Sequence, residues 1–170
     1  MPTNVALIIP ADGRYRIEVR SPDLTDKNAA AGRYQMMISK PRIATEEDRH
    51  YAIAQRALDE ANGLLEKKTV EARRQAVAKL QQSLPEWRAA GDQRREAETL
   101  HSLTMVWNLL GDSNQAMAAG QEYLALSRAM GDRRQEATGL SELGTIFNRM
   151  GDRRKGAEFH RQAMLLSREL

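Results

Sequence analysis

The dipeptide Gly-Asp occurs at four places in this chain, and each lies twenty residues after the one before it. The four are Gly91-Asp92, Gly111-Asp112, Gly131-Asp132 and Gly151-Asp152. The segments between them show helical periodicity and contain no proline. Glycine can adopt the left-handed conformation that ends a helix, and the aspartate can cap the next helix by accepting a bond from a free backbone N–H. Because so short a connection forces neighbouring helices to run antiparallel, the sequence predicts helical hairpins.

The repeating unit is a pair of these segments, since residues 91–130 and 131–170 align at an offset of forty. Self-similarity at a fixed period of this size indicates a solenoid of stacked helix pairs. Two earlier helices are expected after the capping residues Thr45 and Thr69. The fold class is therefore predicted to be mainly α: an α-solenoid of six antiparallel helices, of which the last four span roughly 93–110, 113–130, 133–150 and 153–169.

Apolar residues at helical spacing predict which sides of the helices are buried. The third and fifth helices carry the same set: Ala97/Ala137, Leu100/Leu140, Leu103/Leu143 and Trp107/Phe147. The first two helices carry the stripes Ile53, Ala57, Ala61, Leu64 and Ala72, Ala76, Leu80, Leu84. Pro85 interrupts the second stripe and is expected to kink the helix or end its regular hydrogen bonding nearby.

Residues 1–44 have a different pattern, which predicts a short three-stranded antiparallel β segment. An apolar run at 5–9, a Pro-Ala-Asp-Gly turn signal and an alternating run at 14–20 indicate a hairpin. A third alternating run covers 32–39. We therefore divide the chain into a β segment at 1–44 and a helical domain at 45–170.

The β segment resembles the last strands of the bacterial pre-peptidase C-terminal β-sandwich domain. The residues that carry this resemblance are Pro10, Asp12, Gly13, Tyr15, Ile17, Val19, Gly32 and Tyr34. It implies that residues 1–44 are the remnant of a β-sandwich, and that the chain begins inside a domain and is a fragment of a longer protein.

The helical domain resembles the tetratricopeptide repeats, in their longer forty-residue form. The matching residues of the last unit are Leu140, Leu143, Gly144, Phe147, Gly151, Asp152 and Ala163. Those of the preceding unit are Leu100, Leu103, Trp107, Gly111, Asp112 and Ala116, and the departures are Thr104, Tyr123 and Gly156. The resemblance implies a superhelix that acts as a non-catalytic scaffold and binds a protein or peptide on its concave face.

Forty-residue units that follow a pre-peptidase-like sandwich also resemble the accessory region of bacterial proteins that end in a CHAT-type caspase-like peptidase. This resemblance implies an alternative function, in which the chain is a regulatory region that binds the catalytic domain of its own parent protein. Such a peptidase needs a Cys-His pair, and this chain has no cysteine. We therefore expect no enzyme activity in the chain itself.

Other classes of function find little support in the sequence. There is no glycine-rich phosphate loop, and the three histidines lie on different predicted helices, so we expect neither a cofactor nor a metal site. Residues 45–170 carry nineteen Lys and Arg against nineteen Asp and Glu, which ranks nucleic-acid binding last. No apolar run is long enough to span a membrane, and nothing in the sequence assigns a compartment.

The concave surface is predicted from positions one or two residues away from the core stripe of the first helix in each pair. These positions are Glu98, His101, Met105, Asn108 and Leu109 on the third helix, and Thr138, Ser141, Thr145, Asn148 and Arg149 on the fifth. Amides, hydroxyls and charges of this kind suit an extended peptide held through its backbone. For the two asparagines, a hydrogen bond to a carbonyl one turn back or to water stays an alternative.

The predicted ends of the solenoid suggest further contacts. The last helix carries Phe159, Ala163, Met164, Leu166 and Leu170 and shows no cap signal after it. Because terminal helices of a solenoid need a polar outer face, we expect self-association, or an N-terminal segment that folds onto the first helices.

Overall fold

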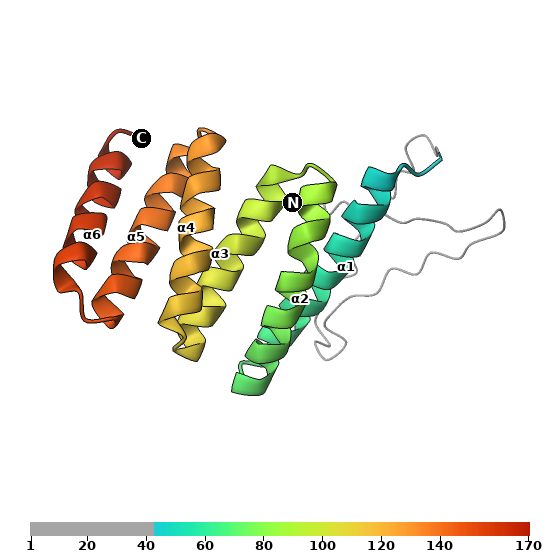
Figure 1. The fold of residues 1–170 in the computed structure, drawn as a ribbon, viewed down its shortest axis with the longest axis horizontal. Coiled ribbons are helices and arrows are strands. Elements are labelled where there is room, and N and C mark those ends of the chain that lie inside the picture. Colours follow the sequence, from blue (N-terminus) through green and yellow to red (C-terminus); the bar gives the residue numbers. More distant parts are fainter. Residues whose placement is uncertain (1–42) are drawn as a thin grey trace, which may run out of the picture.

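The computed structural model describes residues 43–170, which form six α-helices set side by side in a row (Figure 1). The helices are α1 (Glu46–Leu65), α2 (Val70–Ala89), α3 (Gln93–Leu110), α4 (Ser113–Ala129), α5 (Arg133–Arg149) and α6 (Arg153–Arg168). The predicted number and positions of the helices are confirmed. The predicted β segment falls on residues that lie outside the described ones, apart from residues 43 and 44, which belong to no strand.

The Gly-Asp connections have the geometry that the sequence predicts. Gly91, Gly111, Gly131 and Gly151 have φ values of 68°, 82°, 69° and 90°, in the left-handed region that favours glycine. Each following aspartate accepts a hydrogen bond from the backbone N–H three residues on, at 3.0–3.1 Å. Each connection therefore ends one helix and starts the next within three residues.

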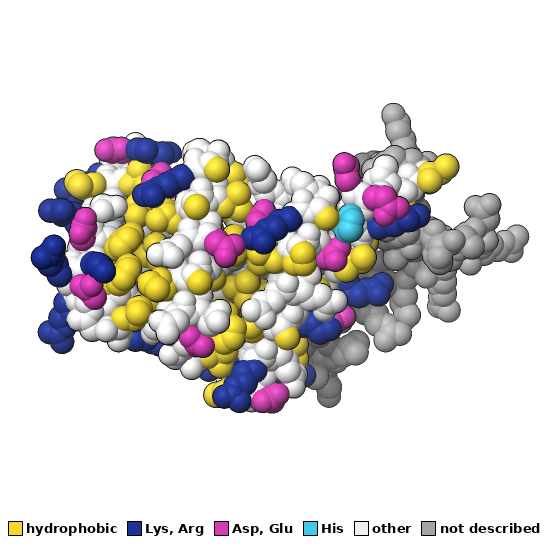
Figure 2. Space-filling model, viewed as in Figure 1, with side chains coloured by type: hydrophobic (Ala, Val, Ile, Leu, Met, Phe, Trp, Pro, Cys, Tyr) yellow, Lys and Arg dark blue, Asp and Glu magenta, His cyan; other side chains and the backbone are white. Residues whose placement is uncertain are grey.

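The helices pack mainly on their neighbours along the chain, and α3 also contacts α5 directly. One cluster of buried apolar side chains spans α1 to α4, and a second spans α4 to α6. Trp107 packs against both clusters. Figure 2 shows hydrophobic side chains along the row of helices, with charged side chains between and around them. The arrangement of stacked helix pairs is compatible with an α-solenoid.

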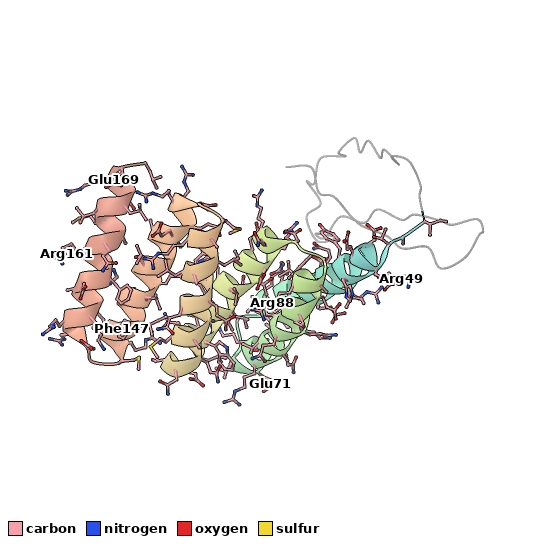
Figure 3. The ribbon with its side chains drawn as sticks, turned by 45° about the horizontal axis from the view of Figure 1, so that its top comes forward. Arg49, Glu71, Arg88, Phe147, Arg161 and Glu169 are labelled. Atoms are coloured by element: carbon pink, nitrogen blue, oxygen red, sulfur yellow. The ribbon has the colours of Figure 1, made fainter. Side chains whose placement is uncertain are left out.

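Ion pairs join successive hairpins at equivalent positions. Arg88 Nε lies 2.5 Å from Glu96 Oε1, and forty residues later Arg128 Nε lies 2.9 Å from Glu136 Oε1. In both cases the arginine is in the last turn of one hairpin and the glutamate is in the first turn of the next. Figure 3 shows Arg88 among the central helices of the stack.

The buried side of several helices differs from the predicted one. On α1, Ala54 and Leu58 are buried with Ala57 and Ala61, whereas Ile53 is 47% exposed. Among the described residues no helix covers the outer side of α1, which explains the exposure of Ile53.

The predicted core positions of Trp107 and Phe147 are only half-buried, and the preceding residues, Val106 and Ile146, are 3% and 1% exposed. Because α3 and α5 are flanked by helices on two sides, their buried arc extends beyond the single predicted stripe.

Helix α2 does not end at Pro85 but continues to Ala89. Pro85 itself is exposed, and its missing N–H removes one helical hydrogen bond. The neighbouring side chains of Leu84 and Trp87 are 8% and 0% exposed, so their burial holds this last turn in helical form.

Candidate functional site

Helices α3 and α5 present one continuous surface because two contacts join them directly. His101 Nε2 of α3 lies 2.8 Å from Glu142 Oε1 of α5. Near the C-terminal ends of the two helices, the Arg149 guanidinium of α5 donates a hydrogen bond to the Asn108 carbonyl oxygen of α3. The predicted role of Arg149, pairing with a ligand carboxylate, thus competes with a contact inside the protein.

Six of the predicted groove residues are exposed on this pair of helices: Met105, Leu109, Ser141, Thr145, Asn148 and Arg149. We call the first four of these the α3–α5 surface. Met105 and Leu109 are 49% and 58% exposed, which is high for apolar side chains. The Thr145 hydroxyl donates to the Ser141 carbonyl oxygen at 3.1 Å, so it keeps its oxygen lone pairs for another donor.

Two other predicted groove residues form hydrogen bonds within their own helices. Glu98 Oε1 lies 3.3 Å from Arg94 Nε, and Glu98 Oε2 lies 3.0 Å from Arg95 Nη1. Thr138 donates from its hydroxyl to the Arg134 carbonyl oxygen at 3.1 Å. Both positions lie toward the start of their helices, before the exposed Met105 and Thr145.

The two repeated asparagines differ in burial, since Asn108 is half-buried and Asn148 is exposed. Asn148 reaches α6: its Oδ1 lies only 2.0 Å from the place that a Cβ on Gly156 would occupy. Glycine at 156 therefore makes room for the amide. The Oδ1 atom of Asn108 is buried, and it has no hydrogen-bond partner among the described residues. The alternative of a carbonyl one turn back is not seen for either side chain amide among the hydrogen bonds of residues 43–170.

His101, Glu142 and Tyr123 bring three titratable side chains from α3, α5 and α4 together. The His101 ring lies 5.2 Å from the Tyr123 ring, centroid to centroid. The hydrogen bond to Glu142 raises the pKa of His101, against the opposing effect of burial. Burial, followed by the charge of Glu142, raises the pKa of Tyr123 to about 12. At neutral pH the tyrosine is therefore neutral, and the histidine is the group that titrates.

This cluster predicts a pH-dependent stability. Because the folded state raises the His101 pKa, the pair contributes its full stability below the unfolded pKa of about 6.5, and the contribution is lost as pH rises through the folded pKa. We expect Glu142→Gln to reduce the loss of unfolding free energy between about pH 5.5 and pH 8. Urea titrations followed by circular dichroism at a series of pH values measure this difference. Identical pH profiles for the variant and the parent chain would contradict the assignment.

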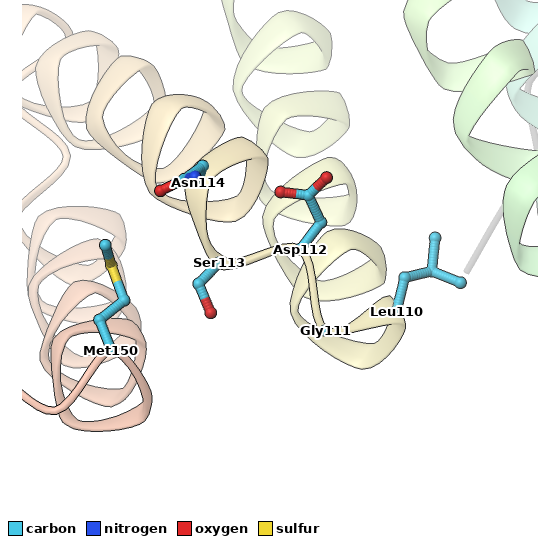
Figure 4. Close-up of a pocket in the computed structure, with 6 residues that line it drawn as sticks. All are labelled: Leu110, Gly111, Asp112, Ser113, Asn114 and Met150. Atoms are coloured by element: carbon cyan, nitrogen blue, oxygen red, sulfur yellow. The ribbon is translucent and has the colours of Figure 1, made fainter.

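The described residues also form a shallow hollow at the tips of two hairpins (Figure 4). Its lining comes from the α3–α4 connection and from the end of α5: Leu110, Gly111, Asp112, Ser113, Asn114 and Met150. The single charged side chain there, Asp112, already caps α4 through the Gln115 N–H. The residues that line the hollow therefore serve to connect the helices, and they offer no evident group for catalysis or binding.

Within residues 43–170, no three His, Asp or Glu side chains are grouped so that they could hold a metal ion. In the same part of the chain, no helix has the length and apolar character needed to cross a membrane.

Sequence reasoning missed Glu142 and Tyr123 as members of the site. Glu142 aligns at an offset of forty with Ser102, so it breaks the repeat, and this departure was the available signal. Tyr123 aligns in the same way with Ala163. No protein-family model matches this chain, and a comparison with curated proteins found no match either.

Proposed function

We propose that this chain is a tetratricopeptide-like repeat protein that binds an extended peptide or protein segment on the α3–α5 surface, without catalysis. The observation that carries the proposal is the exposure of Met105 and Leu109 beside the hydroxyls of Ser141 and Thr145. Apolar anchors with polar groups beside them suit a peptide held by both its side chains and its backbone.

The direct contact between α3 and α5 supports this choice of surface. Since successive first helices approach each other here, the stack is tight on this side, and a ligand can reach both helices at once. The ion pair of His101 with Glu142 and the contact from Arg149 hold the two helices in register. Such preorganisation reduces the conformational entropy that binding must overcome.

A peptide selection tests the proposal. Peptides are selected on the full chain from a random displayed library, and their affinities are measured by calorimetry. The double variant Met105→Ala/Leu109→Ala is expected to weaken binding by about 1–3 kcal/mol, which is roughly tenfold to a hundredfold, because truncated apolar anchors lose buried contact area.

The matched control is Met164→Ala/Leu165→Ala, which removes side chains of the same kind and similar exposure, 48% and 51%, from α6. It is expected to leave the affinity of the selected peptides unchanged. Peptides that lose affinity with the control and keep it with the α3 variant would contradict the proposed surface.

A further inference from the structure

The two outermost helices of the described stack carry opposite charges. Helix α1 has five acidic and two basic residues, and α6 has five basic residues and one acidic residue, Glu158. Figure 2 shows Lys and Arg side chains gathered along the α6 end of the molecule. Opposite potentials at the two ends of a stack favour contact between one end and the other.

On each of these helices some of the charged residues lie along one exposed stripe. On α1, Glu46, Ile53 and Glu60 follow each other at intervals of seven residues, which is nearly two helical turns. We call these three the α1 stripe. Ile53 is 47% exposed, and the side chains of Glu46 and Glu60 are 75% and 46% exposed.

The α6 stripe has the same spacing with the opposite sign: Arg154, Arg161 and Arg168, with Met164 and Leu165 between the last two. Met164 and Leu165 are 48% and 51% exposed. In residues 43–170, none of the three arginines forms an ion pair, and Arg168 contacts only the Met164 sulfur, at 3.7 Å. Figure 3 shows Arg161 on α6 at the end of the row.

The interfaces inside the chain show what fits on this stripe. Arg168 is the third member of a series whose first two members, Arg88 and Arg128, each pair with a glutamate near the start of the next hairpin. The position equivalent to Met164 is Leu124, which is 6% exposed because α5 covers it. The α6 stripe therefore has the chemistry of a surface covered by the first helix of a hairpin.

From these observations we propose that a second copy of this chain docks head to tail, with its α1 stripe on the α6 stripe of the first copy. In an antiparallel contact of the kind that α4 and α5 make, Ile53 meets Met164 and Leu165. Glu46 then lies toward Arg168, and Glu60 lies between Arg154 and Arg161.

Other occupants of the α6 stripe fit less well. Two copies of α6 would bring like charges together, which disfavours a symmetric α6–α6 contact. Residues 1–42 carry seven Lys and Arg against four Asp and Glu, so they have the wrong sign as well. Inside the chain, Glu46 pairs with Arg49 and Glu60 pairs with Lys79 of α2. These four side chains are 39–75% exposed, so exchange of either partner costs little. This contact is separate from the α3–α5 surface and does not depend on the proposed function.

Sedimentation velocity of the full chain over a concentration series, at low and high salt, tests the proposal. We expect association that grows with concentration and whose association constant falls about tenfold or more at high salt, because exposed charges are screened. A chain that stays monomeric under all conditions would overturn the proposal.

Charge reversal then tests the two stripes separately. Arg161→Glu/Arg168→Glu and Glu46→Lys/Glu60→Lys should each abolish self-association. A mixture of the two variants should associate again, since the unchanged α1 of the first then meets the unchanged α6 of the second, and the two reversed stripes also match each other. Failure of the mixture to associate, with both variants shown to be helical by circular dichroism, would argue against the paired stripes.

Cross-linking gives a readout that does not depend on charge, because the chain has no cysteine of its own. The variants Ile53→Cys and Leu165→Cys are each expected to stay uncross-linked alone under mild oxidation, and their mixture should form a disulfide dimer. Dimers that form as readily within either single variant would overturn the head-to-tail arrangement.

Discussion

Replacing Trp87 with alanine should lower the free energy of unfolding by about 3–5 kcal/mol, the range for deleting a large aromatic side chain from a packed core. Trp87 is 0% exposed and belongs to the cluster that spans α1 to α4. Its ring meets the Tyr51 ring edge-on, with centroids 5.1 Å apart. The loss therefore combines a cavity with a lost aromatic contact. Urea unfolding followed by circular dichroism measures it.

Two controls separate the contributions of the Trp87 side chain. Its Nε1 is buried without a hydrogen-bond partner among the described residues, so Trp87→Phe, which removes that N–H and keeps an aromatic ring, should cost far less. Trp107→Ala, at a half-buried position, should also cost less than Trp87→Ala. Equal losses for Trp87→Ala and Trp107→Ala would contradict the picture of Trp87 as the centre of its cluster.

Gly156→Ala is the second change with a large expected effect, a destabilisation of about 1–3 kcal/mol from overpacking. A Cβ at this position would lie 2.0 Å from Asn148 Oδ1 and 2.9 Å from the Gly144 carbonyl oxygen. The second of these is a backbone atom of α5, so the helices themselves have to shift. The strain must exceed the gain of about 1 kcal/mol that alanine normally brings to a helix interior.

A double-mutant cycle isolates the part of this strain that comes from Asn148. Because Asn148→Ala removes the closer of the two atoms, Gly156→Ala should cost less in its presence, with a coupling of more than about 0.5 kcal/mol. The matched control is Gly63→Ala in α1, where a Cβ would meet nothing within 4 Å, and it should stabilise the chain by up to about 1 kcal/mol. A stabilising Gly156→Ala would show that Asn148 does not occupy this space.

The helices and their connections were predictable because their determinants are local. The positive φ of a glycine and the cap formed by the next aspartate depend on a few consecutive residues, so Gly111 and Asp112 identify their own turn. The buried arc of a helix depends on which helices flank it. Ile53 and Ile146 show this dependence, since one is exposed and the other buried according to the presence of a neighbour.

The candidate site was less predictable for the same physical reason. The positions of Met105 and Leu109 beside the core stripe predicted that they lie on an exposed side of α3, and both side chains are exposed. The same pattern did not predict that the Asn148 side chain would lie where a Cβ on Gly156 of another helix would be. Nor could it foresee that His101 finds its partner, Glu142, forty-one residues later on α5.

The packing of each helix on its immediate neighbours has a consequence for how the chain reaches this structure. Residues that touch in space are mostly near each other in the sequence, so folding requires little closure of long loops. Chains with such local contacts fold fast for their size, and a stack of this kind can nucleate at more than one hairpin. The two apolar clusters provide two such starting points, and Trp107, which touches both, is where growth from one would meet growth from the other.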